Sequence, residues 1–143
     1  MSPLMSDCYV LAAERSARLA MSFVSRFVPT HKATWNPDDP SEVLGLSPGA
    51  SLPEVFGFLQ DNPEQEYVVY LRNTGEGSPY YAILSFCADG SLILGLSGDE
   101  DRTAATALLR QLEEFSGGKG YWSVEEAPTE SRSAFLERRL LEG

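Results

Sequence analysis

The stretch that decides the fold is Tyr80-Tyr-Ala-Ile-Leu-Ser-Phe-Cys-Ala-Asp-Gly-Ser-Leu-Ile-Leu-Gly-Leu-Ser97. It contains two apolar-rich runs joined by Ala-Asp-Gly at 88–90, which predicts two strands and a tight turn. A two-residue turn would mix polar and apolar side chains on both faces of this hairpin. A three-residue turn with Gly90 in the left-handed conformation instead gives one wholly apolar face. It pairs Phe86 with Leu92, Leu84 with Leu94, and Ala82 with Leu96.

The second face of the same hairpin is only half apolar. It holds Tyr81, Ile83, Ser85 and Ile93, among others. Because a fully buried face would be apolar throughout, we expect this face to be thinly covered or open to a partner.

Further strands and helices flank the hairpin. The patterns predict strands at 8–13, 67–72 and 121–126, and helices at 14–28, 51–62, about 99–115, and 131–141. The resulting order is β-α-(α)-β-β-β-α-β-α. Because consecutive strands are joined by short connections, we predict an α+β fold with an antiparallel sheet of about five strands, a central three-stranded meander, and helices packed on it.

The chain has 143 residues, which fits a single domain over 1–143. Residues 29–50 carry four prolines and two glycines and predict a long irregular connection.

No motif in the sequence identifies a reaction. The one histidine, His31, follows a predicted helix in a Pro-Thr-His-Lys loop, and neither cysteine lies near it in the sequence. Adjacent acidic pairs such as Glu113-Glu114 point in different directions on regular structure, so they predict solvated surface. The glycine-rich segments at 75–77 and 117–120 lack the spacing of a phosphate-binding loop. We therefore predict a protein that is not an enzyme, with no cofactor and no metal.

The N-terminal residues and the cysteines indicate the compartment. No basic start or uninterrupted apolar run is present, so we expect neither a signal peptide nor a membrane span. Cys8 and Cys87 lie far apart in the sequence, and without a secretion signal two buried thiols are favoured over a disulfide. A cytoplasmic location follows as an expectation.

The acidic charge is concentrated in one block. The net charge of the chain is −10, and 38–101 carries twelve carboxylates against the single base Arg72. Such a charge repels nucleic acid and anionic membranes and attracts basic proteins. The alternative is that the block serves solubility alone.

Three predicted loops, at 35–42, 73–79 and 98–101, carry acidic side chains, and the first of them adds Trp35, an aromatic residue suited to a docking surface. The loops at 73–79 and 98–101 are expected at the same end of the meander. The candidate partner-binding residues are Trp35, Asp38, Asp39, Glu42, Glu76, Asp99, Glu100 and Asp101.

The hairpin at 80–97, together with Gly120-Tyr-Trp and Glu126-Ala-Pro128, resembles small acidic bacterial immunity proteins of polymorphic or contact-dependent toxin systems. The resemblance spans about Tyr67 to Pro128 and contains no functional residue that can be transferred. It implies a non-catalytic inhibitor that occludes a basic toxin domain such as a nuclease. A small acidic secretion-type chaperone or adaptor, which would dimerise and bind a client segment, is the alternative. The oligomeric state is left open.

Overall fold

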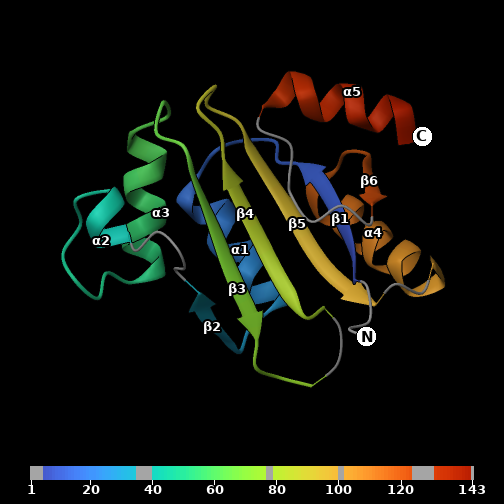
Figure 1. Ribbon diagram of the computed structural model, residues 1–143, viewed down its shortest axis with the longest axis horizontal. Helices are drawn as coiled ribbons and strands as arrows, with labels where there is room; N and C mark the ends of the chain where they lie inside the picture. Colours follow the sequence, from blue (N-terminus) through green and yellow to red (C-terminus); the bar gives the residue numbers. More distant parts are fainter. Residues whose placement is uncertain (1–4, 35–39, 77–78, 100–101, 124–130, 143) are drawn as a thin grey trace.

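One antiparallel sheet organises the part of the chain that the computed structural model describes, which is 5–34, 40–76, 79–99, 102–123 and 131–142. The strand order across the sheet is β2-β3-β4-β5-β1-β6 (Figure 1). The elements in chain order are β1 (Met5–Leu11), α1 (Ala17–Phe27), β2 (His31–Thr34), α2 (Pro40–Val43), α3 (Leu52–Asp61), β3 (Tyr67–Asn73), β4 (Tyr81–Phe86), β5 (Leu92–Asp99), α4 (Arg102–Ser116), β6 (Gly120–Ser123) and α5 (Arg132–Glu142).

The central hairpin has the predicted register. Phe86 lies opposite Leu92, and the neighbouring pairs follow as expected from the three-residue turn. Cys87 donates its amide to the carbonyl of Ser91 at 2.9 Å, which closes the turn, and Gly90 has a φ of 89°. The predicted α+β class and the three-stranded meander β3–β4–β5 are therefore confirmed.

Three helices cover one face of the sheet. In Figure 1, α1 and α4 lie behind the sheet, and α3 lies at its left side. Their apolar side chains form the main core with the inward-facing residues of β1, β3, β4 and β5. The fully buried residues at the centre include Phe23, Phe56, Leu84, Leu94 and Leu112.

The opposite face carries a smaller apolar cluster under α5. Phe135 of α5 is buried and stacks on Tyr121 of β6, with ring centroids 5.4 Å apart. Tyr9, Ile83 and Ile93 complete the centre of the cluster. The half-apolar face predicted from the hairpin is thus covered in part by the C-terminal helix.

The helix boundaries follow local capping signals. The Ser51 side chain and the Glu54 side chain form the predicted capping box at the start of α3. Ser16 caps α1, so this helix begins at Ala17. The apolar periodicity predicted a start at residue 14. Gly117, with a φ of 77°, ends α4.

The connection 29–50 adds a sixth strand to the approximately five that the sequence predicts. The segment 29–50 is not irregular throughout, because it contains β2 and α2, and the sheet therefore has six strands. β2 has only four residues and no apolar alternation, so it is defined by its pairing with β3 and not by its own sequence. His31 lies in this edge strand and not in a loop, and its Nδ1 lies 2.8 Å from the Val28 carbonyl oxygen.

Both cysteines are buried free thiols, as predicted. Cys8 donates from Sγ to the Ala105 carbonyl at 3.3 Å, and burial raises its pKa to about 12. Burial also raises the pKa of Cys87. Because the thiolate is the reactive form, both residues are chemically inert in the folded protein.

We expect neither thiol to react with a disulfide reagent in the native protein at mildly alkaline pH. Both should react in denaturant, and absorbance titration measures the difference. Rapid reaction of one native thiol would contradict the burial described above.

Candidate functional site

Three of the eight predicted partner-binding residues lie in the described part of the chain. Trp35, Asp38, Asp39, Glu100 and Asp101 lie outside the described residues. Their role in binding stays a prediction.

The remaining three predicted residues lie in different elements. Glu42 belongs to α2, Asp99 is the last residue of β5, and Glu76 is exposed in the connection between β3 and β4. Tyr80 donates its amide to the Ser97 carbonyl at 2.7 Å, so the connection carrying Glu76 and the end of β5 lie at the same end of the meander. That part of the predicted geometry is correct.

The charge around Glu76 is mixed. Lys32 and Arg72 are both exposed and lie opposite one another in the pairing of β2 with β3, which ends beside this connection. Among the described residues, this end of the sheet therefore presents two exposed cations together with the carboxylate of Glu76.

A single arginine organises the opposite end of the meander. The Arg15 guanidinium donates to the carbonyls of Leu59 at 2.8 Å, Asn62 at 3.0 Å and Gln65 at 2.6 Å. It also donates to the carbonyl of Cys87 at 2.7 Å and, more weakly, to that of Ser91 at 3.5 Å. One side chain thus joins the end of α3, the connection to β3 and the β4–β5 hairpin.

The chemistry of arginine suits this position. Its planar guanidinium presents five N–H donors in a fixed arrangement, so it can satisfy several carbonyls at once. Its Cζ lies 5.2 Å from the centroid of the Phe86 ring, which adds a cation–π contact. Burial lowers the pKa of Arg15, while the nearby carboxylates of Glu64 and Asp89 oppose that shift. The guanidinium remains charged.

Four carboxylates lie on the three segments that meet at Arg15, and a fifth, Glu14, precedes Arg15 in the chain. We call Glu14, Asp61, Glu64, Glu66 and Asp89 the acidic end of the molecule, and all five residues are exposed. Arg15 hydrogen-bonds to the end of α3, the connection to β3 and the hairpin. These contacts fix the positions of the carboxylates relative to one another. Four of the five belong to the acidic block 38–101, but none is among the candidate partner-binding residues predicted from the sequence.

Asp89 also connects the hairpin to α5. Its Oδ1 accepts from the Ser91 amide at 3.0 Å and from the Ser91 hydroxyl. Its Oδ2 accepts from the amide of Arg132, the first residue of α5, at 2.8 Å. The hydrogen bonds from Ser91 and Arg132 lower the pKa of Asp89. The carboxylate acts as a helix cap supplied from a distant turn.

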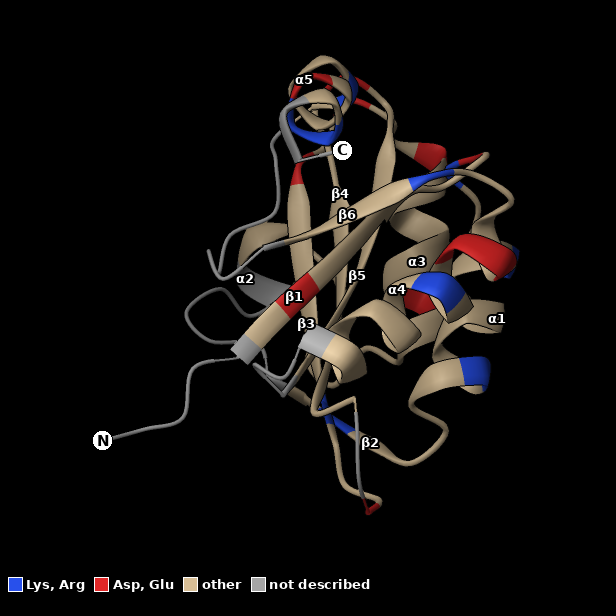
Figure 2. Cartoon of the chain, turned by 90° about the vertical axis from the view of Figure 1, so that its right-hand side faces the viewer, with Lys and Arg blue, Asp and Glu red and all other residues tan. Residues whose placement is uncertain are grey.

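The helical side of the molecule has a different charge pattern. Figure 2 shows basic residues on α1 and both basic and acidic residues on α4. The exposed residues there include Arg18, Arg26, Arg110 and Glu114. This side has no excess of negative charge comparable to that of the acidic end.

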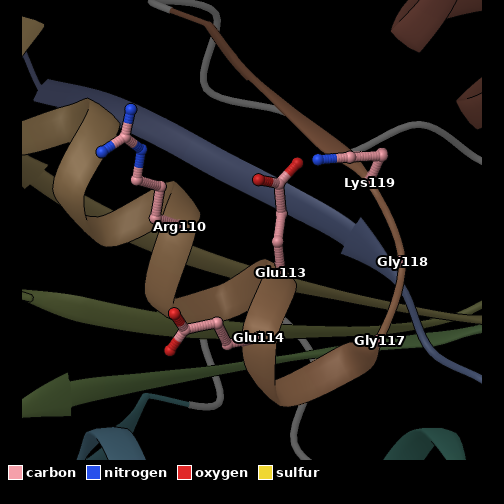
Figure 3. A pocket seen from close by; sticks show the side chains of 6 residues that line it. All are labelled: Arg110, Glu113, Glu114, Gly117, Gly118 and Lys119. Atoms are coloured by element: carbon pink, nitrogen blue, oxygen red, sulfur yellow. The ribbon is translucent and has the colours of Figure 1, made fainter.

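A shallow hollow lies at the C-terminal end of α4. Its volume is about 380 Å³, and Figure 3 shows the side chains of Glu113 and Lys119 extending toward one another across it. Oε2 of Glu113 accepts from the Gly120 amide at 2.7 Å, so this carboxylate has a structural role in joining α4 to β6. The lining residues are Arg110, Glu113, Glu114, Gly117, Gly118 and Lys119.

A buried carboxylate and a phenol lie on the face that α5 partly covers. The Tyr9 hydroxyl donates to Oδ2 of Asp7 at 3.0 Å, and both side chains are buried. Burial and the charge of Asp7 raise the pKa of Tyr9 far above its usual value, so the phenol keeps its proton. The Tyr9 ring lies against Gly95, where a Cβ would be 2.6 Å from Tyr9 Cε1. This close packing indicates a structural pair.

Within the described ranges, no group of three or more His, Cys, Asp or Glu side chains could hold a metal ion. In the same part of the chain, no helix is both long and apolar enough to cross a membrane. No protein-family model, curated protein or solved structure matches this chain.

Replacing Arg15 tests its role in holding the acidic end together. Arg15→Lys keeps the charge but cannot reach the same carbonyls, so we expect a loss of about 3 kcal/mol in the free energy of unfolding. Chemical denaturation measures it. Arg18→Lys, an exposed change on α1, is the control and should cost less than about 0.5 kcal/mol. Equal effects of the two variants would contradict the role of Arg15.

Replacing Asp89 tests the cap on α5. Asp89→Ala removes the acceptor for the Arg132 amide and should destabilise the protein by about 1 kcal/mol at neutral pH. Because folding lowers the pKa of Asp89, the ionised carboxylate stabilises the fold at pH above about 4, and this contribution disappears as the pH falls through the folded pKa. The difference between wild type and variant should therefore shrink in acid. A difference that grows on acidification would show that the ionised cap is not its cause.

Proposed function

We propose that this chain is a non-catalytic binding protein, an immunity-type inhibitor whose acidic surface covers a basic protein partner such as a toxin domain. The observation that carries the proposal is the convergence of five exposed carboxylates around Arg15. These come from segments far apart in the sequence, so the fold itself creates the concentration of charge. The resemblance of the 80–97 hairpin to immunity proteins supports the same class.

The acidic end suits rapid capture of a basic partner. A dense patch of one charge raises the rate of association and orients the partner, while it adds less to the final affinity. Arg15 braces the three segments through five carbonyl contacts, so little ordering is required when a partner binds. Occlusion by such a surface requires no chemical step from the inhibitor.

The position of the surface in this proposal differs from the one that the sequence suggested. Glu76 and Asp99 lie at the opposite end of the meander, where Lys32 and Arg72 dilute the negative charge. We therefore assign the docking role to the acidic end first. Glu76 and Asp99, two of the eight residues chosen from the sequence, are tested separately in the experiment below.

The test requires the basic domain encoded by a neighbouring reading frame, produced with this chain and measured by surface plasmon resonance. Glu64→Lys combined with Glu66→Lys reverses two exposed carboxylates of the acidic end. We expect the association rate to fall about tenfold or more, with a weaker dependence on salt concentration.

Two matched variants complete the experiment. Glu114→Lys with Glu137→Lys makes the same change of charge on exposed positions of α4 and α5 and should alter the rate less than about threefold. Glu76→Lys with Asp99→Lys tests the surface predicted from sequence. If only this last pair slows association, the docking site lies at the other end. If no variant does, electrostatic docking is wrong.

A further inference from the structure

A second hollow, between α5 and the β1–β6 edge of the sheet, has the opposite chemistry to the acidic end. Its volume is about 270 Å³. We call it the α5 hollow, and its lining residues are Leu11, Gly118, Lys119, Phe135, Leu136 and Arg139.

The lining has an apolar part formed by three side chains. Phe135 is buried, and Leu11 and Leu136 are partly exposed, Leu136 by 38%. One turn further along α5, Leu140 is 73% exposed, the highest value among the large apolar side chains of the described residues. Apolar surface of this kind next to a concave site is typical of a docking position.

Two cations contribute the charge of the hollow. Lys119 and Arg139 line it, and none of the described residues that line it is acidic. The neighbouring hollow on α4 shares Lys119 but also contains Glu113 and Glu114.

We propose that the α5 hollow binds a segment of a partner protein that places a leucine- or phenylalanine-sized side chain beside a carboxylate. The apolar group would enter between Leu11, Phe135 and Leu136, and the carboxylate would meet Lys119 and Arg139. Arginine binds carboxylates through paired hydrogen bonds, which gives the site directional selectivity. The volume lies just below the range of about 300–1,000 Å³ found for pockets that hold whole small molecules, so it suits a single side-chain anchor. This site goes beyond the proposed function, since it uses cations and not carboxylates.

The experiment uses a fluorescein-labelled octapeptide with Glu-Leu-Phe-Glu at its centre and measures fluorescence anisotropy with the full chain. We expect weak binding, with a dissociation constant in the high micromolar range. Replacing both glutamates of the peptide with glutamine, or both apolar residues with serine, should each weaken binding about tenfold. Binding of the glutamine peptide as tightly as the parent would overturn the role of the cations.

Protein variants locate the site. Lys119→Glu with Arg139→Glu should weaken binding of the parent peptide about tenfold or more. Arg26→Glu with Lys32→Glu is the matched control, because it adds the same negative charge at exposed positions on α1 and β2. It should change binding less than about twofold. Equal loss in the two variants, or no binding to the intact chain at millimolar peptide, would overturn the proposal. Circular dichroism confirms that each variant is folded.

Discussion

The guanidinium of Arg15 is the constraint on which the arrangement of one end of the molecule depends. Arg15 donates to five main-chain carbonyls from one position before α1. Three of these carbonyls also accept a backbone amide within their own turn, so the guanidinium joins turns that are already formed. Helix, connection and hairpin must therefore meet at this point. The carboxylates of the acidic end therefore lie near one another because Arg15 stabilises the fold at this point.

The sequence predicts those parts of the fold that are specified locally. The register of Phe86 with Leu92 depends only on turn length and on apolar alternation, and the Ser51–Glu54 box depends on residues three apart. The pairing of β2 depends instead on the edge of β3, which four residues with no alternation do not encode. The contacts of Arg15 are not encoded in a sequence pattern, because its partners are main-chain carbonyls and any residue supplies those.

The candidate site was predictable in composition but not in position. Counting charges located twelve carboxylates within 38–101. In an antiparallel meander, successive connections alternate between the two ends of the sheet, so a block that is continuous in sequence is divided in space. Glu76 and Asp89 are close in the sequence yet lie at opposite ends of β4. Glu14 lies outside the block in sequence. It belongs to the acidic end because the next residue, Arg15, hydrogen-bonds to the β4–β5 hairpin.

Asp89 links the two surfaces of opposite charge. Its carboxylate belongs to the acidic end, and it also accepts the first amide of α5, the helix that forms one wall of the α5 hollow. A cation brought by a partner to the acidic end would compete with the Arg132 amide and the Ser91 groups for the same oxygens. Among residues 132–140 of α5, only Phe135 is buried, so the helix depends on this cap more than a deeply packed helix would. Binding at the acidic end is therefore expected to loosen α5, and by the reciprocity of linked equilibria a ligand that holds α5 in place would weaken that binding.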